Sequence, residues 1–149
     1  MITINNKNTK KSILVVTHPE CEYCKEYSKS EYCQNIPLTK KIVLYPKDDT
    51  FFEEEKLKLV FRADEPKTYF KAIMSDRKYN NINYSKDVTK QWNENQNMIK
   101  LIEDKFGKIK YTPTIFLLSE DNILEKEIIV DVDFTKLIYA EVSKYNENK

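Results

Sequence analysis

Two cysteines three positions apart are the residues of this chain best suited to chemistry. Cys21-Glu-Tyr-Cys24 follows a short apolar run, residues 12–17, and begins a stretch with the pattern of a helix. A cysteine at a helix N-terminus faces unpaired backbone N–H groups and the positive end of the helix dipole, and both favour the thiolate that attacks disulfides. The spacing therefore predicts Cys21 as a nucleophile and Cys24, one turn on, as the thiol that resolves a mixed disulfide.

A second motif, Tyr111-Thr-Pro-Thr114, stands directly before the apolar run 115–118. In the element order predicted below, the strand that starts here begins beside the cysteine helix. A cis bond before Pro113 would then expose the backbone of Thr112 to an extended substrate. The alternative is a trans proline at the start of an edge strand. We predict the cis form, with Thr112 and Pro113 in a substrate groove.

The elements that position these motifs follow from hydrophobic periodicity and from the placement of prolines. The predicted strands are 12–17, 41–45, 114–118 and 123–130. The predicted helices are 21–34, a helical insertion at about 48–106 that ends near Gly107, and a closing helix over 134–142. The order β-α-β, helical insertion, β-β-α predicts an α/β fold with a mixed central sheet. Residues 1–11 are predicted to be a polar N-terminal arm, and 12–149 one domain.

Composition excludes several classes of protein. The 149 residues suit one domain, and 25 basic against 24 acidic side chains lack the basic excess of most nucleic-acid binders. The only glycine is Gly107, so no glycine-rich phosphate loop exists. No apolar run approaches the roughly 20 residues of a membrane span. Three cysteines cannot all pair within one chain, and residues 1–11 do not resemble a signal peptide, so the compartment stays open.

The charged neighbours of Cys21 are candidates for tuning its reactivity. Glu22 repels a thiolate and is one candidate for proton transfer from Cys24. His18 adds positive charge when it is protonated, although a single histidine in a loop after a strand more often has a structural role or lies in solvent. A zinc site made of His18, Cys21, Cys24 and Cys33 is an alternative. Cys33 lies nine residues past Cys24, about half a turn around the predicted helix, so we expect no metal and interpret Cys33 as a packing thiol.

These motifs resemble the thioredoxin fold, and most closely the catalytic domain of the bacterial periplasmic disulfide isomerases, the DsbC/DsbG family. The resemblance covers about residues 12–145. It includes Cys21-x-Tyr23-Cys24, the strand Ile42-Val-Leu-Tyr-Pro46, and Thr112 before the proline. It also includes Phe61-Arg-Ala-Asp-Glu-Pro66 and Phe70-Lys-Ala-Ile-Met74 of the helical insertion.

The resemblance implies periplasmic or otherwise exported thiol–disulfide exchange, of the isomerase or reductase kind, although a cytoplasmic location is not excluded. Cys21 and Cys24 would be catalytic, and Tyr23, Thr112 and Pro113 would bind substrate. The redox-active cysteine pair would need no cofactor. Its partners would be protein thiols and disulfides and a redox protein that resets the pair. Only eleven residues precede the predicted first strand, where the family has a dimerisation domain, so we expect a monomer.

Two other functions remain open at this point. The first is a peptide-binding or chaperone-like module that uses the groove at Thr112 without redox turnover. The second is the zinc-binding module, which would hold stoichiometric metal after purification.

Overall fold

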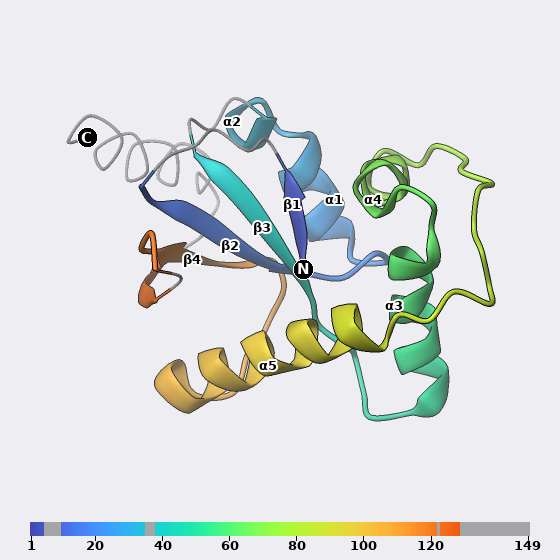
Figure 1. The fold of residues 1–149 in the computed structure, drawn as a ribbon. Helices are drawn as coiled ribbons and strands as arrows, with labels where there is room; N and C mark the ends of the chain where they lie inside the picture. Colours follow the sequence, from blue (N-terminus) through green and yellow to red (C-terminus); the bar gives the residue numbers. More distant parts are fainter. Residues whose placement is uncertain (5–9, 35–37, 122, 129–149) are drawn as a thin grey trace.

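A five-stranded mixed sheet forms the centre of the chain, with the strand order β1-β3-β2-β4-β5 (Figure 1). The computed structural model describes residues 1–4, 10–34, 38–121 and 123–128. The strands are β1 (Ile2–Ile4), β2 (Ser12–Thr17), β3 (Thr39–Leu44), β4 (Thr114–Leu118) and β5 (Leu124–Ile128). The helices are α1 (Glu22–Lys29), α2 (Glu31–Gln34), α3 (Phe51–Arg62), α4 (Pro66–Met74) and α5 (Thr89–Phe106).

The central strand is β2, which runs parallel to β3 and antiparallel to β4. The β2–helix–β3 crossover is the predicted β-α-β unit, and the antiparallel pair β4–β5 is the predicted hairpin. The α/β class with a mixed sheet is therefore confirmed. The predicted closing helix over 134–142 lies outside the described residues, as does the end of the strand predicted over 123–130.

The chain starts differently from the prediction. Residues 1–11 were expected to form a polar arm, but Ile2–Ile4 forms strand β1, which pairs antiparallel with β3. Ile2 and Ile4 are both buried on one face of this strand, and Thr3 between them is exposed. The strand at Ser12 is therefore the second strand and not the first. The sequence did not predict β1 because three residues are too few for an alternation of buried and exposed positions to stand out among polar neighbours.

The predicted helix over 21–34 is interrupted at Ser30, where the backbone is extended. The Ser30 hydroxyl donates to the carbonyl of Tyr27 at 2.7 Å and accepts the N–H of Cys33 at 3.1 Å. One serine thus ends α1 and caps α2, because its short side chain can satisfy backbone groups on both sides.

Both faces of the sheet are covered, which is why every residue of β2 is buried. Ile13 and Val15 join a core cluster that includes side chains of α1, α3 and α4. Leu14 and Val16 point to the other face and join a cluster with Ile102 and its neighbours in α5. The two-residue period of β2 therefore divides the protein into three layers (Figure 1).

The helical insertion is confirmed as α3, α4 and α5 between β3 and β4. Asn95, fully buried in α5, ties this insertion to the sheet. Its side chain accepts the N–H of Leu44 and donates to the carbonyl of the same residue, each at 2.8 Å. Gly107 ends α5 with φ at 86°, a conformation that glycine adopts without strain.

No helix in the described part of the chain is long and apolar enough to cross a membrane.

Candidate active site

Cys21 stands directly before α1 and caps this helix with its own sulfur. Its Sγ accepts the backbone N–H of Cys24 at 3.2 Å, the bond that a Ser, Thr, Asp or Asn side chain makes at most helix starts. The N–H of Cys21 donates to the carbonyl of His18 at 3.2 Å, which closes the turn between β2 and α1. The unpaired N–H groups of the first turn and the helix dipole favour negative charge on this sulfur.

Cys24 lies on the buried side of the first turn of α1, whereas Cys21 is partly exposed. Burial raises the pKa of the Cys24 thiol to about 11, and a hydrogen bond with Cys21 acts in the same direction. Hydrogen bonds with Thr17, Thr112 and the backbone of His18 act in the opposite direction and are weaker. Cys24 is therefore a protonated, shielded thiol at neutral pH, as expected of a resolving cysteine.

Thr112 meets Cys21 from the other side. Its hydroxyl donates to Sγ of Cys21 at 3.3 Å, and the Cys21 thiol lies 3.5 Å from the Thr112 carbonyl oxygen. Strand β4 pairs antiparallel with β2, with Thr114 opposite Val16, so the segment just before β4 lies at the C-terminal end of β2. The peptide bond between Thr112 and Pro113 is cis. The sequence prediction that these two motifs lie together is consistent with this geometry.

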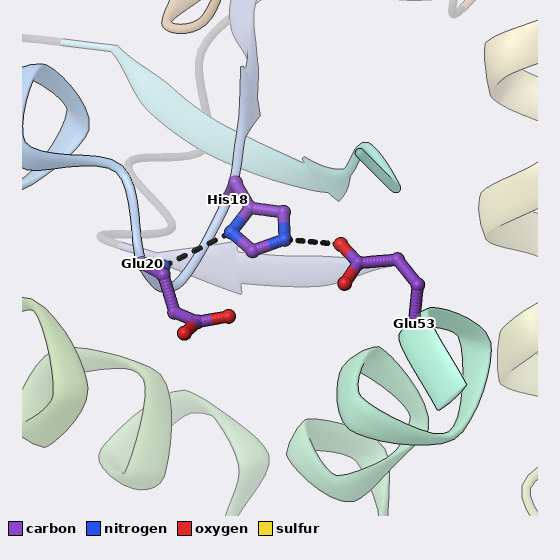
Figure 2. A group of neighbouring side chains, drawn as sticks. All are labelled: His18, Glu20 and Glu53. Carbon is purple, nitrogen blue, oxygen red and sulfur yellow. Dashed lines mark hydrogen bonds and ion pairs between the residues drawn. The ribbon is translucent and has the colours of Figure 1, made fainter. Parts of the chain in front are cut away.

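His18 is buried beneath the cysteine loop, with only 1% of its surface exposed. Figure 2 shows its ring between two partners. The N–H of Glu20 donates to Nδ1 at 3.0 Å, and Nε2 lies 2.5 Å from a carboxylate oxygen of Glu53. Since Nδ1 accepts a hydrogen bond, the proton of a neutral ring sits on Nε2 and is donated to Glu53. His18 therefore fixes the turn that carries Cys21.

Glu53, in the first turn of α3, was not predicted from the sequence. Burial on its own would raise the pKa of this carboxyl. Hydrogen bonds from the Lys47 N–H and His18, with the positive charge of Lys56, hold the pKa below its ordinary value instead. The only sequence signal was Thr50-x-x-Glu53, a pattern typical of a helix start. Thr50 does cap α3, but the Glu53 carboxylate turns to His18.

The side chains of His18, Glu20 and Glu53 form a group whose ligand-type atoms lie within 4.8 Å of one another (Figure 2). The ammonium of Lys56 already bridges the two carboxylates, at 2.6 Å from Glu20 and 3.5 Å from Glu53. Within the described residues this is the one such group of three or more, and it contains no cysteine. In the described part of the chain His18, Cys21, Cys24 and Cys33 do not form such a group, which argues against the four-ligand zinc alternative.

The other two predicted site residues extend into solvent. Tyr23 is 71% exposed on the first turn of α1. The Glu22 carboxylate lies 3.8 Å from the ammonium of Lys25, and its side chain is largely exposed. The roles predicted for them, substrate binding and tuning, remain predictions.

A cleft of about 480 Å³ opens beside Cys21 and Thr112. We call it the active-site cleft. One wall comes from α5 with Ile99, and the other from the segment after β3 with Tyr45. Its charged residues have both signs: Lys47, Asp48, Asp49, Glu103, Lys108 and Lys110. Tyr111, at its edge, is half exposed and offers an aromatic face to a peptide chain.

Cys33 lies away from this cleft, buried in α2. Its sulfur is 3.6 Å from the ammonium of Lys40, and burial raises the pKa of the thiol. This placement is consistent with the predicted packing role.

No protein-family model matches the chain, and no curated protein matches it in sequence. Several solved structures match it in fold. Wolbachia pipientis alpha-DsbA1 has a TM-score of 0.65 at 14% identity, covering 97% of this chain and 90% of that one. Chlamydia trachomatis DsbA has a TM-score of 0.57 at 16% identity, and the match covers 99% of this chain and 92% of that one. A disulfide interchange protein from Neisseria gonorrhoeae has a TM-score of 0.57 at 15% identity, and the match covers 94% of this chain and 93% of that one.

These similarities, together with the sheet order, show that the chain has the thioredoxin fold. At identities of 14–16% they concern the fold and not the activity. Two of these three structures carry the DsbA name and none the DsbC or DsbG name, so the expected subfamily is not supported over its thioredoxin-fold relatives.

Proposed function

We propose that this protein is a thiol–disulfide oxidoreductase that acts on protein substrates. The observation that carries the proposal is the sulfur of Cys21, which caps α1 and accepts hydrogen bonds from the Cys24 N–H and the Thr112 hydroxyl. A negative sulfur is stabilised by such donors, and thiolate is the attacking form. The fold shared with structures named DsbA and disulfide interchange protein supports the same activity.

In the proposed reaction, the Cys21 thiolate attacks one sulfur of a substrate disulfide. A Cys21–substrate bond forms, the substrate S–S bond breaks, and the first substrate thiolate leaves. Cys24 then loses its proton, to water or to the departing thiolate, and attacks Sγ of Cys21. The substrate departs with two thiols, and the protein keeps the Cys21–Cys24 disulfide. The same steps in reverse oxidise a substrate dithiol, and no cofactor beyond the cysteine pair takes part.

Substrate would lie in the active-site cleft, with its backbone against Thr112 and Pro113 and its side chains against Tyr111 or Tyr23. We propose that the protein works as an exported monomer and that a separate redox protein resets the pair. Whether isomerisation, reduction or oxidation dominates depends on the reduction potential of Cys21 and Cys24.

Trapping of the mixed disulfide tests this proposal. Cys24→Ser removes the resolving thiol, so a protein substrate attacked by Cys21 stays covalently bound and is released by dithiothreitol. The matched control is Cys33→Ser, which we expect to trap nothing. Failure of Cys24→Ser to trap a reducible adduct with a disulfide-containing protein would remove the enzymatic proposal.

A second candidate, a peptide-binding module without turnover, is favoured by the size of the active-site cleft and by the exposed Tyr111. Cys21→Ser separates the two proposals. The enzyme loses all activity in the refolding of a scrambled disulfide protein, whereas a binding module retains its effect on refolding yield.

A further inference from the structure

A second cavity, of about 260 Å³, brings three basic side chains together. We call it the cationic pocket. It is lined by Lys40 of β3, Lys71 of α4 and Arg77 just after α4, with the hydroxyl residues Ser28 and Ser75. Among the residues that the structure describes, no acidic side chain lines it. Lys40 lies at the N-terminal end of the parallel pair β2–β3, whereas Cys21 follows the C-terminal end of β2, so the pocket is separate from the active-site cleft.

Lys40 is the most unusual member of the pocket because only 6% of its surface is exposed. Its ammonium donates to the carbonyl of Cys33 at 2.9 Å and lies 3.6 Å from the Cys33 sulfur. Neither partner carries a full negative charge when the thiol is protonated. Burying a cation without an anion is costly, so most buried lysines are paired.

The other two cations of the pocket also lack carboxylate partners within 4 Å among the described residues. Burial, together with the positive charges of Lys67, Lys40 and Arg77, lowers the pKa of Lys71. The nearest acid in the sequence, Asp76, is engaged elsewhere: its carboxylate lies 3.0 Å from Lys25 and 3.9 Å from Lys29.

Elsewhere in the described chain, several partly buried cations are paired. The pairs are Lys11–Glu125, Lys25–Asp76, Lys56–Glu20, Lys58–Glu54 and Arg62–Glu55. The cationic pocket differs from these pairs, because its three basic side chains share one cavity that no acidic side chain of the described residues lines. An anion that entered would relieve the mutual repulsion of all three.

We propose that the cationic pocket binds a small tetrahedral oxyanion, namely phosphate or the phosphoryl group of a soluble monoester. Lys71 and Arg77 supply charge and N–H donors from the exposed rim, and the Lys40 ammonium supplies charge at the buried end. The hydroxyls of Ser28 and Ser75 are short donors suited to the remaining oxygens. This site is independent of the proposed redox function, because none of its lining residues is a cysteine or belongs to the active-site cleft.

The test is a titration of the full chain with inorganic phosphate in a buffer free of other oxyanions. Binding is measured from the changes in backbone amide chemical shifts by NMR. We expect saturable shifts at Ser28, Ser75 and Arg77 with a dissociation constant of about 1–10 mM, a weak affinity that suits a small ion. The variant Lys71→Gln/Arg77→Gln should weaken binding at least tenfold. Lys67→Gln/Lys78→Gln removes the same charge from exposed neighbours that do not line the pocket, and we expect it to bind as the wild type does.

Linear, unsaturated shifts, or equal effects of the two double variants, would overturn the proposal, since either result means diffuse attraction to a basic surface. A parallel arm uses phosphatidylglycerol vesicles to distinguish a lipid headgroup from a soluble ion. Binding to vesicles but not to phosphate would also overturn it. Loss of phosphate binding in Lys71→Gln/Arg77→Gln with unchanged disulfide exchange would support the pocket and leave the proposed function untouched.

Discussion

The hydroxyl of Thr112 lies 3.3 Å from the sulfur of Cys21, although the two residues are 91 positions apart in the chain. The contact exists because β4 pairs with β2, so the loop before β4 ends where β2 turns into α1. Two loops that are distant in the sequence thus bring the Thr112 hydroxyl and the N-terminus of α1 to the same sulfur. This convergence makes Cys21, rather than the other two cysteines, the expected nucleophile.

Thr112→Val should slow the reaction of Cys21 with iodoacetamide at least tenfold, because a hydrogen bond to a charged group contributes about 1.5–3 kcal/mol and about 1.4 kcal/mol corresponds to a factor of ten. Valine keeps the branched shape of threonine and removes only the donor. The rate is measured by mass spectrometry of the Cys21 peptide. Thr68→Val, at an exposed position of α4, is the matched control and should react as the wild type does. Equal rates in the two variants would show that the hydroxyl does not assist the sulfur.

The three cysteines should differ in their alkylation. Since burial raises the pKa of Cys24 to about 11, only about one Cys24 side chain in a thousand is a thiolate at pH 8. Burial also raises the pKa of Cys33 and shields its sulfur. We expect Cys21 to be modified first, with Cys24 becoming reactive only as the pH rises toward 11. Peptide mass spectrometry over a pH series checks this order, and faster labelling of Cys24 at neutral pH would reverse the assigned roles.

Glu53→Gln should destabilise the protein by about 1–2 kcal/mol at neutral pH, because the variant loses the buried charge that His18 and Lys56 face. The folded pKa of Glu53 lies below its ordinary value, so the unfolded chain takes up this proton first as the pH falls. The stability from ionised Glu53 is therefore present above about pH 4.5 and is lost as the pH falls through the lowered folded value.

Urea denaturation of the wild type and of Glu53→Gln at about pH 7 and about pH 3.5 measures both effects. The stability gap should shrink at the lower pH. Glu26→Gln, an exposed glutamate of α1, should show no gap at either pH. A stability gap that stays constant with pH would mean that the carboxylate charge is not what stabilises His18 and the turn that carries Cys21.

Asn95→Ala should cost about 2–4 kcal/mol, because the N–H and carbonyl of Leu44 each lose a buried hydrogen bond. Asn97→Ala, two positions on and exposed, is the matched control and should be close to neutral. Denaturant midpoints measure both variants. A small effect of Asn95→Ala would show that α5 docks through its apolar contacts alone.

The sequence predicted those parts of the site that depend on local patterns. Runs of β-branched residues placed the strands over 12–17 and 114–118, and the Cys-x-x-Cys spacing placed Cys21 at a helix start. The meeting of Thr112 with Cys21 followed from element order alone. Glu22 was chosen because it neighbours Cys21 in the chain, and Tyr23 because of the family resemblance. Both extend into solvent, since successive residues of a helix point in different directions.

What could not be predicted depends on partners distant in the chain. Glu53 lies 35 residues from His18, and its sequence context indicated only a helix cap. For His18 the sequence left two roles open, added charge near Cys21 or a structural role, and the enclosure of its ring between a backbone N–H and a carboxylate favours the structural one. The strand Ile2–Ile4 depends on its pairing with β3, and a three-residue pattern carries no periodicity to reveal it.

The reduction potential of the cysteine pair shows whether Cys21 and Cys24 form one redox couple. The protein is equilibrated with glutathione redox buffers, and the Cys21–Cys24 disulfide is quantified by thiol alkylation and mass spectrometry. We predict a single two-electron couple between about −120 and −270 mV, the range of known Cys-x-x-Cys exchange proteins. Cys33→Ser should retain this couple, and Cys21→Ser and Cys24→Ser should each abolish it. If no disulfide between Cys21 and Cys24 forms in any of these buffers, or if the couple requires Cys33, then Cys21 and Cys24 are not the redox-active pair.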